Sequence, residues 1–384
     1  MNTRKVILIW GLLLCCLFFP SVQAYAEGNQ SIDTEQLEEF REDISDGIDD
    51  TLDGDVKKVL EENDISLDNP QGINKISVGS VIGNVFSGFI DALRSPLIML
   101  GKLLAITVLC VVAQSIAPDG SSVTGVFKIA GILATITIMY DTIYANIGAV
   151  EASLQQLSEF MISYIPIFSS ITAIGGSITS SGSYYAITLI VCEIVALIAS
   201  KVIMPFLSII LAISLVSAIN PNLQFGGSAE SIKKACQWIL GGLTTIFVGL
   251  LTIQGMTGTA TDSIITRTAK FAASSFIPII GGAVSEAYST VYSSLGVIRT
   301  SVGTIGIIAI LIMVLQPVIT IIATKFVVSL AQIISGLFNQ QECCDFFKST
   351  NAVLSIALSV VICFSLIFII STAVLMLMAM NISI

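Results

Sequence analysis

The sequence contains no histidine among its 384 residues. This absence removes Ser–His nucleophilic catalysis, histidine metal ligation and a histidine proton relay. The sequence also lacks the Gly-x-x-x-x-Gly-Lys-Ser/Thr phosphate loop, so any energy for transport must come from an ion gradient or from another protein. No cysteine pair has the spacing of a metal knuckle, and no disulfide framework is visible. We therefore expect neither an enzyme nor a bound metal or cofactor.

Charged residues are also scarce. They make up 11% of the chain, against 54% hydrophobic residues, whereas soluble domains carry about 25% charged residues. The net charge of −10 comes from one segment: sixteen acids and three bases lie between residues 27 and 68, and eleven acids and twelve bases follow residue 70. An acidic tail of this kind repels nucleic acid, so we expect no nucleic-acid partner. The composition predicts an all-α polytopic membrane protein.

The start of the chain has the three parts of an export signal. Two basic residues precede an apolar run, Val6 to Phe19, that is too short to span a bilayer. Ala24-Tyr25-Ala26 then places small residues at the two positions that specify cleavage. We predict that residues 1–26 are a signal peptide and that the mature chain begins near Glu27, outside the cytoplasm. The alternative is an uncleaved first transmembrane helix.

Residues 27–70 form the acidic exported segment. One apolar stripe, at spacings of three, four and four residues, predicts a helix face that nothing in the segment itself covers. A docking helix for a protein partner is one interpretation, and a partly disordered acidic tail is the other. The candidate partner-binding residues are Leu37, Phe40, Ile44 and Ile48.

Residues 71–94 follow with apolar and polar side chains on separate faces, which predicts an interfacial helix lying on the membrane. Residues 95–384 form the multi-spanning domain, with about seven or eight transmembrane helices in all. Two shorter stretches, 160–176 and 271–282, are candidates for re-entrant or interfacial segments. The predicted crossings are Pro96–Ala117, Thr124–Ile147, Tyr184–Ile219 (a tight hairpin or one long broken helix), Ala235–Met256, Val302–Phe338 and Ala352–Met380.

An internal repeat is predicted near 160–220 and 272–338, with an offset of 112 between the numbers of matching positions. Tyr164-Ile165-Pro166-Ile167 recurs as Phe276-Ile277-Pro278-Ile279, and a second proline follows each copy at the same interval, at 205 and 317. Repeats with interrupted hydrophobic segments are typical of transporter-like folds. Chance similarity between apolar runs is the alternative. A true repeat predicts that both later prolines lie in the protein interior, close to each other.

Several polar residues fall in or near the apolar stretches. A charge at the bilayer centre costs at least about 2.5–3.5 kcal/mol, so it faces protein or water. Such residues either line a pathway or make helix–helix hydrogen bonds, and a lysine can also extend to the interface. The candidate polar or structural membrane positions are Glu193, Lys201, Gln254, Asp262, Arg267, Lys270, Gln316, Pro205 and Pro317.

The least apolar passage of the body resembles the signature of the stage III sporulation protein AE family. That signature is carried by Gln254-Gly255, Thr261-Asp262, Arg267-Thr268-Ala269-Lys270-Phe271 and Phe276-Ile277-Pro278. Gly101-Lys102-Leu103-Leu104 and Val202-Ile203-Met204-Pro205 are similar to the family as well.

The resemblance implies a part in endospore formation. Members of that family belong to a complex in the mother-cell membrane around the forespore, thought to act as a secretion-like channel or feeding tube. The implied partners are the other stage III sporulation A-operon proteins, including the secretion-ATPase-like AA, and forespore protein Q. The resemblance supplies no catalytic residues. A stand-alone secondary transporter built from the repeat is the alternative function.

Overall fold

The computed structural model describes residues 42, 44–48, 52, 54–62, 78–116, 122–174, 178–219, 230–253, 264 and 281–380. Every regular element in these ranges is a helix, which confirms the predicted all-α class. Five helices in the described ranges are long and apolar enough to cross a membrane. The predicted signal peptide lies outside the described residues.

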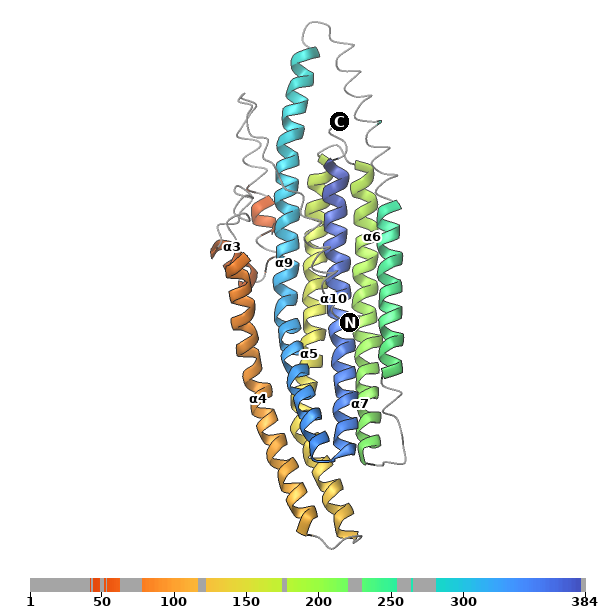
Figure 1. Cartoon of the computed structure of the whole chain (residues 1–384). Coiled ribbons are helices and arrows are strands. Elements are labelled where there is room, and N and C mark those ends of the chain that lie inside the picture. Colours follow the sequence, from red (N-terminus) through yellow and green to blue (C-terminus); the bar gives the residue numbers. More distant parts are fainter. Residues whose placement is uncertain are drawn as a thin grey trace.

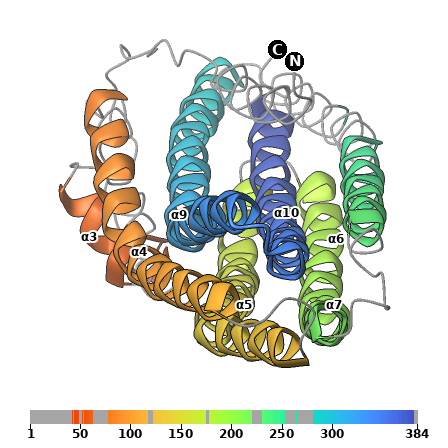
Figure 2. The same cartoon turned by 60° about the horizontal axis from the view of Figure 1, so that its bottom comes forward.

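Long helices run up and down the bundle (Figure 1). The last of them, α10, lies in the middle of the bundle, with α5, α6, α7 and α9 packed around it (Figure 2). It is the most buried of the candidate membrane-crossing helices. The elements are α3 (Gly54–Glu62), α4 (Val78–Ile116), α5 (Ser122–Ile174), α6 (Ile178–Leu197), a π-helical segment (Ile198–Ile203), α7 (Met204–Ile219), a helix described over Glu230–Ile253, α9 (Gly281–Leu337) and α10 (Gln341–Met380).

Two helices are much longer than a bilayer is thick. With 53 residues in α5 and 57 in α9, a rise of 1.5 Å per residue gives lengths of about 80 and 85 Å. The hydrocarbon core of a bilayer measures about 30 Å. Residues 160–174 continue α5 without a break, so the re-entrant interpretation of the 160–176 stretch is wrong. The expected division near residue 94 also coincides with no helix end, because α4 runs through it.

The prolines interrupt the helices less than expected. Pro317 lies inside α9, which stays α-helical through it. The 184–219 stretch is a broken helix, not a hairpin: its π-helical turn ends just before Pro205, which occupies the first turn of α7. Proline cannot donate the backbone hydrogen bond that continues a helix, and the wider π turn before it accommodates this interruption.

The two prolines differ in their surroundings, too. Pro317 is buried, whereas Pro205 is exposed on the surface of the chain. The expectation that both lie in the interior is therefore wrong for Pro205. The repeat itself stays a prediction, because its second Ile-Pro-Ile copy, at 277–279, lies outside the described residues.

Helices from later in the chain cover part of the apolar stripe of the acidic segment. Ile44 and Ile48 are buried within the chain itself, by helices outside the acidic segment. The stripe continues at four-residue intervals through Leu52, Val56 and Leu60, all buried. It packs beside α9 and α5: α3 contacts α9, and a Cβ at Gly47 would lie 3.5 Å from Ile167 Cδ1. Leu37 and Phe40 lie outside the described residues.

Close packing between α5 and α9 depends on a glycine. Tyr164 is fully buried, and its hydroxyl donates a hydrogen bond of 3.0 Å to the Val302 carbonyl. Its ring lies against Gly306, where a Cβ would come within 2.4 Å of the phenol carbon and oxygen. No side chain fits there unless the helices move apart.

We expect Gly306→Ala to destabilise the protein by about 1–3 kcal/mol, the usual cost of overpacking a filled interior. Thermal unfolding of the purified protein in detergent, followed by loss of helical circular dichroism, measures the change. Gly296→Ala on the same helix is the control, since a Cβ at Gly296 meets nothing within 4 Å. Equal melting temperatures for the two variants would contradict the proposed close contact.

Candidate functional site: a polar seam along α10

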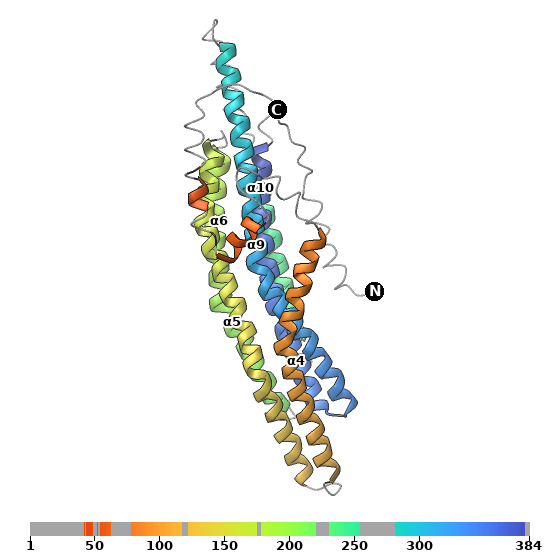
Figure 3. The same ribbon diagram turned by 90° about the vertical axis from the view of Figure 1, so that its left-hand side faces the viewer.

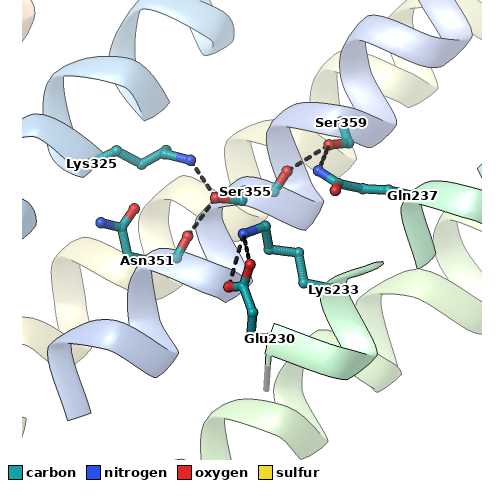
Figure 4. Close-up of polar contacts among 7 residues, drawn as sticks. All are labelled: Glu230, Lys233, Gln237, Lys325, Asn351, Ser355 and Ser359. Carbon is teal, nitrogen blue, oxygen red and sulfur yellow. Dashed lines mark hydrogen bonds and ion pairs between the residues drawn. The ribbon is translucent and has the colours of Figure 1, made fainter. Parts of the chain in front are cut away.

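Polar side chains follow one face of the central helix. Asn351, Ser355, Ser359 and Cys363 recur every four residues of α10, so they line up along the helix axis. This row, which we call the polar seam, lies between α9 on one side and the helix at 230–253 on the other (Figure 4). It brings hydrogen-bonding groups into a bundle whose interior is mostly apolar.

On the α9 side, a lysine joins the seam. Lys325 Nζ donates to Ser355 Oγ, and Asn351 Nδ2 donates to Ser329 Oγ at 2.7 Å. Ser329 in turn donates to the Lys325 carbonyl at 2.8 Å. Ser355 is buried and Lys325 half-buried, so the ammonium group is held against polar oxygens and away from hydrocarbon.

On the other side, the seam contacts the helix at 230–253. Gln237 Nε2 donates to Ser359 Oγ at 3.0 Å, and Thr244 Oγ1 lies 2.6 Å from Cys363 Sγ. These two contacts are seven residues apart in one helix and four apart in α10, so each helix presents one polar face to the other.

The two seam serines use their hydrogen-bonding capacity in the same way. Ser355 Oγ donates to the Asn351 carbonyl at 2.7 Å, and Ser359 Oγ donates to the Ser355 carbonyl at 2.8 Å. Each hydroxyl is therefore a donor along α10 and an acceptor for a neighbouring helix. This satisfied arrangement holds three helices in register.

A buried ion pair lies beside the seam. Lys233 is 4% exposed, and its Nζ contacts Glu230 Oε1 at 2.8 Å and Oε2 at 2.9 Å (Figure 4). Glu230 is more exposed, at 39% of its side chain. Pairing within one helix turn neutralises a lysine that would be costly to bury alone.

The seam contains none of the site residues predicted from the sequence. Glu193, Lys201 and Gln316 are exposed on the surface of the chain. Sequence reasoning passed over the seam because the 352–380 stretch is strongly apolar on average. The four-residue spacing of its polar residues was the signal that could have found it. The predicted positions Gln254, Asp262, Arg267 and Lys270 lie outside the described residues.

The contacts that the seam makes with neighbouring helices are hydrogen bonds. No group of three or more His, Cys, Asp or Glu side chains there is arranged to hold a metal ion. The seam offers hydroxyls, amides and one ammonium group, which suits helix association.

Comparison with known proteins identifies the family. The family model described as stage III sporulation protein AE matches residues 62–379. The chain belongs to this family. It is also similar to the stage III sporulation protein AE of Bacillus subtilis (strain 168), with 25% identity over 235 residues. That match covers 61% of this chain and 59% of the relative, so the chain spans less than two thirds of the relative's length. No solved structure matches.

Membership of this family, together with the apolar helices, makes the chain a sporulation membrane protein. The described helices from α4 to α10 fall within the matched residues, except for Met380, the last residue of α10. The polar seam is therefore part of the family's shared region, and so is the helix bundle that carries it.

We expect Ser355→Ala to lower the melting temperature in detergent, because it removes the oxygen that accepts from Lys325. Interhelical hydrogen bonds in membrane proteins contribute about 0.6 kcal/mol on average and up to about 1.7. Ser365→Ala is the matched control: Ser365 is also buried on α10, but its hydroxyl donates only to the Ile362 carbonyl. Equal melting temperatures for the two variants would show that the seam does not hold the helices together.

Proposed function

We propose that this protein is an integral membrane component of the channel complex that joins the mother cell to the forespore and supports endospore development. The family match over residues 62–379 carries the proposal. The Bacillus subtilis relative bears the name stage III sporulation protein AE, and the resemblance seen in the sequence implies a secretion-like, trans-envelope complex. In this proposal the chain contributes structure and not catalysis.

The length of α9 supports a role within an assembly. Two large apolar residues of α9 lie on the surface: Val297, in the first third of the helix, is 55% exposed, and Leu337, at its end, is 80% exposed. Forty residues separate them, which is about 60 Å along the axis. Even a tilt of about 40° leaves them about 46 Å apart across a core of about 30 Å. One of these two exposed side chains therefore lies outside the hydrocarbon core, which favours contact with another protein there.

The proposed partners follow from the family. They are the other stage III sporulation A-operon proteins, including the secretion-ATPase-like AA, and forespore protein Q. The sequence has no phosphate loop of its own, so an ATPase partner would supply the energy. The alternative of a stand-alone transporter gains no support from the seam, whose serines are satisfied within the chain.

We further propose that the protein lies in the mother-cell membrane around the forespore, with its mature N-terminus outside the cytoplasm. Lysines gather near one end of the bundle, where α5, α10 and the helix at 230–253 begin. Apart from α3, which carries Lys57 and Lys58, the described helix ends at the opposite end have no Lys or Arg in their terminal two turns. Basic residues favour the cytoplasmic side, so α3 would lie on the exported side (Figures 1 and 3). The lysines are Lys128, Lys233, Lys234 and Lys348.

Deleting the gene from its own spore-forming host tests the function. We expect engulfed forespores that fail to sustain late gene expression, with wild-type vegetative growth. Restoring the full chain should restore heat-resistant spores, and affinity purification of it from sporulating cells should recover the A-operon proteins. Normal spore yield in the deletion strain would refute the proposed role.

Cysteine labelling tests the orientation. In a background without the native cysteines, Lys58→Cys on α3 should react with an impermeant maleimide in intact protoplasts. Asp345→Cys on α10 should react only after permeabilisation. Both positions are exposed, so a difference in labelling reports the side of the membrane. The reverse pattern would invert the topology.

A further inference from the structure

A cleft of about 410 Å³ opens between α4 and α5. From α4 it is lined by Asp91, Arg94, Ser95, Ile98 and Lys102, which lie on one face of the helix. From α5, Asp141 faces the same space. The two helices lie side by side toward the lower end of the bundle (Figure 3). The cleft thus combines two carboxylates and two cationic groups around an apolar side chain.

The position of this cleft suits a membrane interface. At a rise of about 1.5 Å per residue, the stretch of α4 from Arg94 to its end at Ile116 is about 33 Å long. The stretch of α5 from its start at Ser122 to Asp141 is about 29 Å long by the same rise. Each length is close to the thickness of one hydrocarbon core, about 30 Å. The hairpin from the cleft to its tip therefore matches one crossing of the bilayer.

An aromatic pair marks the same level. Tyr140 and Tyr144 stack with their ring centroids 5.9 Å apart, and they are 48% and 63% exposed. Exposed tyrosines gather where lipid head groups begin. On α4, Leu97 and Ile98 are also exposed, so acyl chains can lie directly beside the charged cleft.

The four charged side chains of the cleft do not form ion pairs with one another. The ion pairs found among the described residues near the lysine end join Lys128 to Glu342 and Lys233 to Glu230, and neither involves the cleft. All four cleft groups are exposed. Two acids and two bases in one cleft complement a ligand that carries both a phosphate and an ammonium group.

The geometry points to a binding site for the head group of phosphatidylethanolamine. Arg94 contacts its phosphate, and Lys102, about 12 Å deeper along α4, extends its side chain toward the same phosphate. Asp91 and Asp141 accept hydrogen bonds from its primary ammonium. Ile98 lies against the start of the lipid tails. A quaternary choline group has no N–H to donate, and a glycerol head group has no positive charge. The site therefore favours phosphatidylethanolamine over both. This inference requires only membrane insertion and does not rest on the proposed sporulation role.

Native mass spectrometry of the full chain tests the site. The protein is released from bilayers containing equal amounts of phosphatidylethanolamine, phosphatidylcholine and phosphatidylglycerol, and the retained lipids are counted. Two added ion-pair contacts predict about fivefold preference for phosphatidylethanolamine over phosphatidylcholine. Asp91→Asn with Asp141→Asn should abolish this preference. Arg94→Gln with Lys102→Gln should lower retention of all three lipids.

Additional variants and a soluble-ligand test control this experiment. Ser95→Phe fills the cleft without changing a charge and should also abolish the preference. Lys234→Gln and Asp345→Asn alter exposed charges elsewhere and should leave it intact. Equal retention of the three lipids by the wild-type protein, or an unchanged preference in the double Asp variant, would overturn the proposal. Saturable binding of soluble phosphoethanolamine without lipid selectivity would assign the cleft to a water-soluble ligand and overturn the lipid assignment.

Discussion

The thickness of a bilayer limits how much of this bundle lipid can cover. A hydrocarbon core of about 30 Å corresponds to about 20 helical residues, and α5 and α9 have 53 and 57. On α9, the exposed apolar residues Val297 and Leu337 lie farther apart along the helix than one crossing is long. The helices therefore pack against one another over lengths greater than the thickness of the membrane.

Cohesion over such lengths needs more than apolar contact, because lipid solvates leucine as well as another helix does. The chain uses close approach and hydrogen bonds. Gly306 lets the Tyr164 ring lie against the α9 backbone, and the phenol hydroxyl reaches the Val302 carbonyl. On α10, Ser355 and Ser359 bond both along their own helix and to a neighbour. These contacts specify which faces meet, a choice that apolar surfaces alone leave open.

The helical class followed directly from the composition, since only helices satisfy the backbone of long apolar stretches in lipid without a closed barrel. Helix continuity did not follow. Pro317 suggests a break to a reader of the sequence, yet α9 passes through it. The stripe containing Ile44 and Ile48 was visible as a pattern, but a pattern does not say what covers it. That answer lies in α5 and α9, far along the chain. The seam was not predicted, because the mean hydropathy of an apolar stretch changes little when single polar residues recur in it at regular spacing.

The acidic segment and the α4–α5 hairpin together indicate which part of the bundle surface faces lipid and which part the chain itself covers. The Lys128–Glu342 ion pair, at 3.0 Å, ties the start of α5 to the start of α10. Measured along α5, Asp141 lies about 20 Å above this pair and Ile167 about 58 Å above it. If the α4–α5 hairpin defines the crossing, the level of Ile167 lies well beyond the core on the exported side. That is where Gly47 approaches α5. The buried stripe from Ile44 to Leu60 then acts as a cover for apolar helix surface that lipid does not reach. The stripe covers only part of this long apolar surface. An assembly partner would bury the most apolar area by binding to the part that stays exposed.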